Sequence, residues 1–392
     1  MHVLYVSGQD SGGLPHYTAE LANAVAAHAD VTVLKPSETS ADDVFDDAVD
    51  VRSVFRPLGL SVARISSREF APLRTARGIL SYRYLREIRA IDPDLVHDAT
   101  DLFPQVKLFL KAYGIDRRYP LVVTRHEVEQ NRFSLARPHH AAEELADCLI
   151  PDLRSDGCVV HTRNQRQALV DRGASAADIR VIPHGAYSLF GTHEDIDSTP
   201  EENCLLFFGN IIRYKGIVPL IRAIPLVKER FPDVKLLVAG KGRLPPETAP
   251  ILEAHEENFE VHNRFIPNEE VQEFFERAAV VVLPYKRRAG GMNGHSGVLS
   301  AALSFGKPVV TSRAGDFPSL VGATGCGVTV PSEAPEALAT AICRVLGDDD
   351  ARAEMAAASR RLADELSWEH VADQHLSLYE TVVETDRTSP ES

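Results

Sequence analysis

The sequence has few cysteines, no long apolar run and no excess of positive charge, and each shortage excludes a class of protein. Its five cysteines are odd in number and widely spaced, and no pair has the spacing of zinc ligands. This pattern favours reduced core thiols over a disulfide framework. No apolar run is long enough to span a bilayer, and residues 1–10 lack the basic start and long apolar stretch of a signal peptide. We therefore expect a cytoplasmic protein, with peripheral attachment to the inner membrane face as an alternative.

Acidic residues outnumber basic ones, 56 Asp and Glu against 42 Lys and Arg, which gives a formal net charge of −14. A nucleic-acid-binding protein usually carries the opposite balance, so we expect no nucleic-acid partner. The 392 residues, of which 44% are hydrophobic, suffice for two domains, each with its own core.

Short β-branched runs alternate with longer helical stretches along the chain, which predicts parallel sheets with crossover helices. The predicted fold class is α/β, with two Rossmann-like, doubly wound domains that hold a ligand in the cleft between them. We expect an N-terminal domain at 1–190, a polar linker at 191–203, a C-terminal domain at 204–366, and a last helix with a polar tail within 367–392. The expected strands are 2–7, 31–34, 94–97, 121–124, 157–160 and 180–182, then 205–208, 235–239, 260–262, 280–283, 309–311 and 328–330.

The stretch 290–308 combines a glycine-rich loop with an apolar helical run that ends in Phe-Gly-Lys-Pro. Small residues let a ligand approach the backbone, and the first turn of the helix offers unpaired N–H groups and about half a positive charge. A diphosphate is the natural ligand of such a loop. A merely flexible connection is the competing interpretation.

Two further loops join an expected strand to a helix. Gly12 and Gly13 follow the first strand but do not form the G-x-G-x-x-G fingerprint, which argues against hydride chemistry. They permit close approach of a phosphate or a sugar, or else form a simple tight turn. Arg213 and Lys215 follow the strand at 205–208, where two cations could neutralise a departing diphosphate, or else lie solvated on the surface.

Polar residues also follow other strands at the edge where a doubly wound sheet displays reactive groups. His126 could donate to a developing negative charge or to a sugar hydroxyl, or could be a structural histidine. Glu127 could act as a base, pair with Arg125, or be a solvated acid of the loop. Gly242 and the ring of Phe265 could form a wall for a nucleotide base.

Taken in order, these motifs resemble the family 4 glycosyltransferases, which have the GT-B fold, and the resemblance covers nearly the whole chain. It implies a nucleotide-sugar donor, UDP- or GDP-linked, held mainly by the C-terminal domain, transfer with retention of configuration, and no metal or other cofactor. It also implies that the last helix crosses back to the N-terminal domain. The motifs are Gly-Gly (12–13), Val-Ile-Pro-His-Gly (181–185), Phe-Phe-Gly to Tyr-Lys-Gly (207–216), Val-Ala-Gly-Lys-Gly (238–242), Leu-Pro-Tyr (283–285), Ser-Gly-Val (296–298), Phe-Gly-Lys-Pro-Val-Val (305–310) and Ser-Trp-Glu (367–369).

Carried over by position, the resemblance implies that Lys215 binds the donor diphosphate and that His126 lies near the donor sugar. With Arg213, these are the candidate catalytic residues, and Gly12 and Gly13 are the candidate loop for phosphate and acceptor. The candidate donor-binding residues are Gly209, Gly242, Phe265, Ile266, Asn293, Ser296, Gly297 and Val298, and Glu127 and His184 are further candidates.

The chain departs from the family pattern at three places. The family's pair of glutamates spaced E-x7-E falls on Asn293 and Ala301, the arginine after the first glycine is Asn210, and Gly-Gly-x-Pro-Glu is replaced by residues 315–319. We interpret these as marks of a divergent branch. Without a carboxylate to act as nucleophile, front-side attack by the acceptor hydroxyl is favoured.

The predicted function is therefore a retaining transferase that moves a sugar to a hydroxyl of a glycan or lipid-linked glycan. The alternatives are a nucleotide-sugar epimerase or phosphorylase of the same fold, and a non-catalytic binder of sugar nucleotides.

The segment 52–89 holds nine arginines and two glutamates, so nine minus two gives a local charge of +7. Interleaved apolar residues make it a candidate for peripheral membrane contact or for binding a lipid-diphosphate acceptor. A solvated helix face paired with acids is the alternative.

Overall fold

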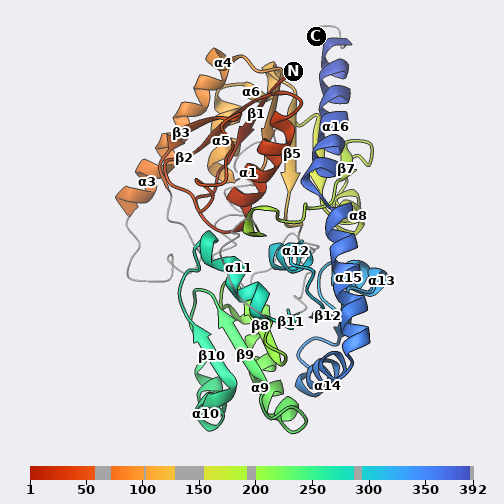
Figure 1. Ribbon diagram of the computed structural model, residues 1–392. Helices are drawn as coiled ribbons and strands as arrows, with labels where there is room; N and C mark the ends of the chain where they lie inside the picture. The colour runs from red at the N-terminus through yellow and green to blue at the C-terminus, as the bar shows by residue number, and fades with distance from the viewer. Residues whose placement is uncertain (58–71, 101–102, 129–153, 192–199, 287–293, 389–392) are drawn as a thin grey trace. The chain divides into compact units, whose positions relative to one another are not determined.

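The computed structural model describes residues 1–57, 72–100, 103–128, 154–191, 200–286 and 294–388 (Figure 1). The chain forms two compact units. The first contains Met1–His184 together with Trp368–Ser392, and the second contains Gly185–Ser367. Most of the predicted linker lies outside the described residues, and the predicted domain boundaries stay a prediction.

The first unit is built on a seven-stranded sheet in which every pairing is parallel, in the order β3-β2-β1-β4-β5-β6-β7 (Figure 1). The chain winds outward from β1 to β3 and then crosses to the other side of β1, so the strand order reverses between β1 and β4. Loops at such a reversal are where doubly wound sheets bind ligands. The strands are β1 His2–Val6, β2 Asp30–Pro36, β3 Asp50–Phe55, β4 Leu95–Asp98, β5 Leu121–Arg125, β6 Gly157–Val160 and β7 Ile179–Val181.

The second unit repeats this plan with six parallel strands in the order β10-β9-β8-β11-β12-β13. Its reversal lies between β8 and β11. The strands are β8 Cys204–Phe208, β9 Lys235–Ala239, β10 Phe259–His262, β11 Val280–Leu283, β12 Val309–Ser312 and β13 Gly327–Val330.

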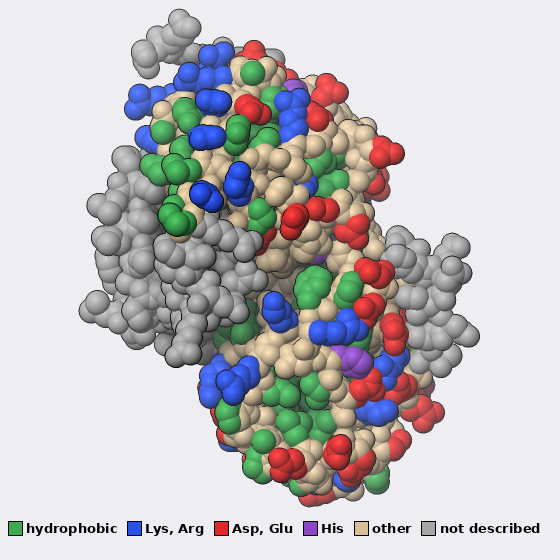
Figure 2. Space-filling view, turned by 90° about the vertical axis from the view of Figure 1, so that its left-hand side faces the viewer, with side chains coloured by type: hydrophobic (Ala, Val, Ile, Leu, Met, Phe, Trp, Pro, Cys, Tyr) green, Lys and Arg blue, Asp and Glu red, His purple; other side chains and the backbone are tan. Residues whose placement is uncertain are grey.

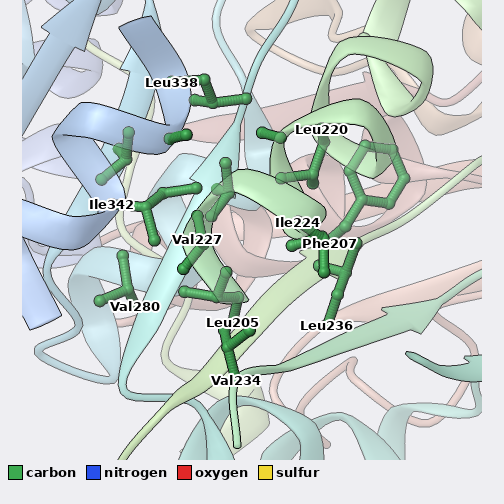
Figure 3. Packing of buried hydrophobic residues seen from close by; sticks show 14 of the residues in the cluster. Leu205, Phe207, Leu220, Ile224, Val227, Val234, Leu236, Val280, Leu338 and Ile342 are labelled. Atoms are coloured by element: carbon green, nitrogen blue, oxygen red, sulfur yellow. The ribbon is translucent and has the colours of Figure 1, made fainter. Parts of the chain in front are cut away.

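Helices cover the sheets, and their apolar faces form the cores. In the second unit, α9 (Ile217–Lys228) and α14 (Pro335–Leu346) pack against the central strands, and Leu220, Ile224 and Ile342 are fully buried there (Figure 3). The remaining elements of this unit are η2 Leu189–Gly191, η3 Arg213–Lys215, η4 Pro246–Thr248, α10 Ala249–Ala254, η5 Glu256–Asn258, α11 Asn268–Arg277, α12 Gly297–Ser304, α13 Phe317–Thr324 and α15 Asp349–Glu365, where η marks a 3₁₀ turn.

In the first unit the last helix of the chain, α16 (Trp368–Thr388), packs against α1 (Gly13–Ala26). The hydroxyl of Tyr379 on α16 lies 3.0 Å from the Tyr5 hydroxyl and 2.7 Å from Nδ1 of His97, so buried hydrogen bonds attach the helix to β1 and β4. No helix in the described ranges is long and apolar enough to cross a bilayer. The other elements are α3 Pro72–Ser81, η1 Tyr82–Glu87, α4 Ile88–Ile91, α5 Pro104–Ala112, α6 Ile115–Arg118 and α8 Arg163–Asp171.

The predicted fold class is confirmed, and all twelve predicted strands are present, with ends that coincide or shift by at most two residues. The strand that sequence analysis missed is β3. It pairs only with β2 at the edge of its sheet, and most of its side chains are exposed or half-buried. An edge strand needs no continuous apolar run, so the signal that identified the central strands is absent from it.

Candidate functional site

Lys215 occupies the loop between β8 and α9, at the carboxyl edge of the second sheet. Two glycines fix its position. Gly209 has a φ of +92°, and a Cβ built on it would lie only 2.8 Å from the Lys215 Nζ. Gly216 has a φ of +76°, and a Cβ there would lie 1.8 Å from the carbonyl oxygen of Pro284. Backbone leaves no room for a side chain at Gly216, and a side chain at Gly209 would displace the ammonium group from the end of β8.

The Lys215 side chain is half-buried beside an aromatic ring. Its Nζ is 5.6 Å from the centre of the Tyr285 ring, and burial lowers its pKa below the ordinary value. Among the described residues, no carboxylate pairs with it. A partly desolvated cation without a counter-ion favours an anionic ligand.

The N-terminus of α12 contributes to the same place. The Ser296 Oγ accepts a hydrogen bond from the Leu299 N–H and lies 3.0 Å from the Tyr285 hydroxyl, so Tyr285 contacts both the helix cap and the lysine. Val298 lies close to the lysine as well. A Cβ built on Gly209, which would meet the Lys215 Nζ, would also lie 3.4 Å from the Val298 Cγ2. The N–H groups of Gly297 and Val298 have no acceptor among the residues that the structure describes. Lysine, helix dipole and free amides thus form a candidate diphosphate site.

Arg213 has a different environment from Lys215. Its side chain is 70% exposed and pairs with Glu247 at 3.0 Å. In this arrangement its charge is already neutralised at the surface. A role in charge stabilisation therefore requires this ion pair to open, and it stays a prediction.

The other predicted donor-binding residues differ in how exposed they are. Gly242 would place a Cβ 2.4 Å from the carbonyl oxygen of Ile211, so close packing of two backbones explains the glycine. Ile266 is buried. The Phe265 ring is 55% exposed between β10 and α11 and is available for stacking on a base. Asn293 lies outside the described residues.

Sequence analysis missed a buried network beside the loop that precedes α12. His295 donates from Nδ1 to Asp316 Oδ2 at 2.6 Å and accepts at Nε2 from the Ser300 hydroxyl at 2.8 Å. The order Ser–His–Asp matches that of a nucleophilic triad. Ser300 is fully buried within α12, however, so no substrate reaches it. We interpret the network as a clamp that fastens the chain at His295, just before α12, to the start of α13. The sequence marked Asp316 only as a departure from the family pattern.

The first unit carries a separate cluster at the carboxyl ends of β5 and β6. His126 follows β5 and is 8% exposed, with Nε2 at 2.9 Å from the carbonyl oxygen of Ala99 and Nδ1 at 3.0 Å from Nε2 of His161. The ring of Tyr17 on α1 meets His126 nearly at a right angle, with 4.6 Å between ring centres. His184 packs against both Tyr17 and Trp368. His126 and His184 are thus members of one buried aromatic cluster.

The remaining candidates of this unit lie on loops. Gly12 has a φ of +90° and stands at the N-terminus of α1, where its carbonyl oxygen accepts a hydrogen bond from His16 Nδ1 at 2.9 Å. Gly13 begins α1, and Glu127 is exposed. His161 was not predicted. Its only signal was its place directly after β6, at the same sheet edge as His126.

Comparison with known proteins gives matches over most of the chain. Residues 11–186 match the family model described as Glycosyltransferase Family 4, and residues 202–348 match the model described as Glycosyl transferases group 1. The chain is 25% identical over 404 residues to D-inositol 3-phosphate glycosyltransferase of Jonesia denitrificans, covering 95% of this chain and 91% of that protein. It is 31% identical over 185 residues to the protein of the same name from Corynebacterium urealyticum, covering 45% of this chain and 42% of that one.

Among solved structures, HepE of Anabaena in complex with UDP-glucose is similar, with a TM-score of 0.70 and 16% identity. The match covers 97% of this chain and 100% of HepE. At that identity the likeness shows a common fold.

Proposed function

The chain belongs to glycosyltransferase family 4 and is an enzyme that transfers a sugar, and from this premise we propose that its donor is a UDP- or GDP-sugar bound by the second unit. The observation that carries the proposal is the half-buried Lys215 ammonium beside the N–H groups of Gly297 and Val298, which have no acceptor among the described residues. A diphosphate supplies the anion that this site lacks. HepE, which shares the fold, was solved with UDP-glucose, and this supports the donor class.

The chemistry follows from charge. As the glycosidic bond breaks, negative charge grows on the departing diphosphate, and donors already aimed at its oxygens stabilise it without reorganising. Lys215 and the first turn of α12 fill this role, and loss of one such donor costs about 3 kcal/mol in the barrier. Because the chain itself supplies the charge, we propose that transfer needs no metal ion or other cofactor.

Retention of configuration is the stereochemical part of the proposal. Ala301, where the family pattern has a carboxylate, is buried and carries none. We therefore favour attack by the acceptor hydroxyl on the face that the diphosphate leaves, with His126 near the sugar. The proposed acceptor is a glycan or lipid-linked glycan. The relatives named for D-inositol 3-phosphate make a phosphorylated polyol the first alternative to test.

A product assay tests the proposal against its alternatives. Purified enzyme is incubated with a panel of UDP- and GDP-sugars, with and without acceptor and with inorganic phosphate. The proposal expects acceptor-dependent release of nucleoside diphosphate and a product with the donor's anomeric configuration, unaffected by EDTA. An isomerised sugar nucleotide without acceptor would identify an epimerase, and a sugar phosphate would identify a phosphorylase. If the protein bound a sugar nucleotide but consumed none of the donors, it would be a non-catalytic binding protein.

A second proposal concerns the arginine-rich segment, where we propose peripheral contact with an anionic membrane. Leu73 and Leu80 on α3 are 75% and 57% exposed, and Arg77 lies between them on the same helical face. Figure 2 shows Lys and Arg side chains interleaved with hydrophobic ones on one part of the surface. Arg77 and Arg83 make no ion pair with any acid among the described residues. Each cation near an anionic bilayer contributes about 1 kcal/mol.

Flotation with liposomes separates membrane contact from a solvated helix face. The proposal expects the protein to float with anionic vesicles and not with neutral ones, and the double substitution Leu73→Ser and Leu80→Ser to weaken flotation. Equal flotation with anionic and neutral vesicles would contradict the proposed membrane contact. Arg64 and Arg68 lie outside the described residues.

A further inference from the structure

The hydrogen bonds of His126 and His161 fix how many protons the two rings share. Each ring uses both nitrogens. His126 Nε2 contacts the carbonyl oxygen of Ala99 at 2.9 Å, and His161 Nδ1 contacts the carbonyl oxygen of Ile182 at 3.1 Å. A carbonyl oxygen only accepts, so each of these outer nitrogens must carry a proton.

The inner nitrogens face each other at 3.0 Å, His126 Nδ1 against His161 Nε2. In a neutral imidazole one nitrogen is protonated and the other is not. If both rings were neutral, the two inner nitrogens would both be bare and their lone pairs would repel. One additional proton between them turns the contact into a hydrogen bond and gives the pair a single positive charge.

We propose that His161 is a positioning residue that shares one proton with His126, so that the pair holds a fixed positive charge at the carboxyl ends of β5 and β6. The inference rests on the proposed function for its purpose. In the proposed function this positive charge stabilises an oxygen that becomes negative during sugar transfer. His126 is the member of the pair that presents the charge, because it is 8% exposed and His161 is 5% exposed.

The surroundings hold both rings in place. Gln165 is fully buried, donates to the backbone carbonyl of His126 and accepts from the backbone N–H of His161, which locks the two strand ends together. Tyr17 packs against both rings at 4.6 and 5.4 Å between centres, and a positive pair is favourable beside its π-system. Burial raises the pKa of the Tyr17 hydroxyl, so this neighbour stays neutral.

Other titratable groups around the pair come from several elements. His184 packs against His161 with 5.5 Å between ring centres. His375 on α16, 3.4 Å from the Tyr17 hydroxyl, has its pKa lowered to about 4 by burial and is neutral at physiological pH. Burial, and after it repulsion from the protonated forms of His375 and His126, holds the pKa of His97 well below its ordinary value. Asp98 precedes Ala99 in sequence, and Arg125 and Glu127 flank His126.

The substitution His161→Gln tests charge separately from orientation. The glutamine amide can donate to the bare Nδ1 of a neutral His126 and so preserve the ring's orientation, but it cannot share a proton. We expect turnover to fall by about a hundredfold at pH 8.5, the scale of losing one charge-stabilising donor. It should recover towards the wild-type rate as the pH is lowered from 8.5 to 6, because an added proton on His126 restores the lost charge. A defect in folding or packing would lower turnover by a similar factor at both pH values, and that result would overturn the proposal.

Nitrogen-15 NMR of the imidazole rings gives a readout that does not depend on activity. At pH 7.5 we expect the four ring nitrogens of the pair to hold three protons, one on each outer nitrogen and one shared by the two inner nitrogens. The signal of the shared proton should vanish in His161→Gln. The exposed His28→Gln serves as control and should change neither readout. Two neutral rings at pH 7.5 would overturn the inference. A protonated pair in an enzyme that transfers no sugar would instead overturn the proposed function alone.

Discussion

The substitution Gly209→Ala should displace the Lys215 ammonium while leaving every charged residue in the chain. The new methyl group would stand 2.8 Å from the Lys215 Nζ and 3.4 Å from Val298 Cγ2. The first distance is shorter than real Cβ contacts, and the flexible lysine side chain is the group that can move. The ammonium should therefore leave its place beside the start of α12.

The magnitude has two parts that one control separates. At a φ of +92°, alanine costs about 1–2 kcal/mol in backbone strain. Gly173 has nearly the same φ, +93°, but a Cβ there has nothing within 4 Å. Gly173→Ala therefore carries the strain without the displacement. A charged hydrogen bond contributes about 1.5–3 kcal/mol, so loss of the lysine contact should weaken binding by about 10- to 150-fold.

The assay is calorimetric titration of UDP and GDP into both variants, with urea unfolding in parallel. We expect both alanines to lower the free energy of unfolding by similar amounts, and only Gly209→Ala to weaken binding of the nucleotide. If both variants bind as the wild type does, Lys215 does not hold the diphosphate and the reasoning from Gly209 is refuted.

The remaining predictions concern single side chains. Lys215→Ala should lower turnover at least a hundredfold with an unchanged melting temperature, measured by donor consumption; near-normal turnover would remove this lysine from the mechanism. Asp316→Asn should lower the free energy of unfolding by about 1–3 kcal/mol, because the buried side chain of His295 loses a charged acceptor. Urea unfolding measures this change, and an unchanged free energy would contradict the interpretation of the network as a clamp. Hydrogen bonding from Arg277 lowers the pKa of Glu260 to about 2 from 4.5, so its carboxylate adds stability above pH 4.5 that is lost as the pH falls towards 2. The stability gap between wild type and Glu260→Gln should therefore close over that interval, and a gap independent of pH would contradict the assignment.

The sequence predicted those parts of the fold that depend on local pattern. β8 and β12 are short apolar runs buried on both faces, and such runs identify central parallel strands. Lys215 is predicted as a diphosphate ligand because it lies between a strand and a helix, where doubly wound sheets bind phosphates. β3 escaped because an edge strand needs no such run.

The side-chain pairs could not be predicted, because they join residues that are distant in sequence. His126 and His161 are 35 residues apart, and His295 and Asp316 are 21 apart. No local periodicity records which strand ends become neighbours or which loop packs on which. The ion pair of Arg213 with Glu247 has the same origin. It shows that a cation in the right loop is not necessarily free to bind a ligand.

A crystal structure with the UDP- or GDP-sugar that the product assay selects tests the central claim most directly. We predict that the diphosphate oxygens lie within hydrogen-bond distance of the Lys215 Nζ and of the N–H groups of Gly297 and Val298. A nucleotide bound elsewhere, with the Lys215 ammonium still facing Tyr285 alone, would contradict the account.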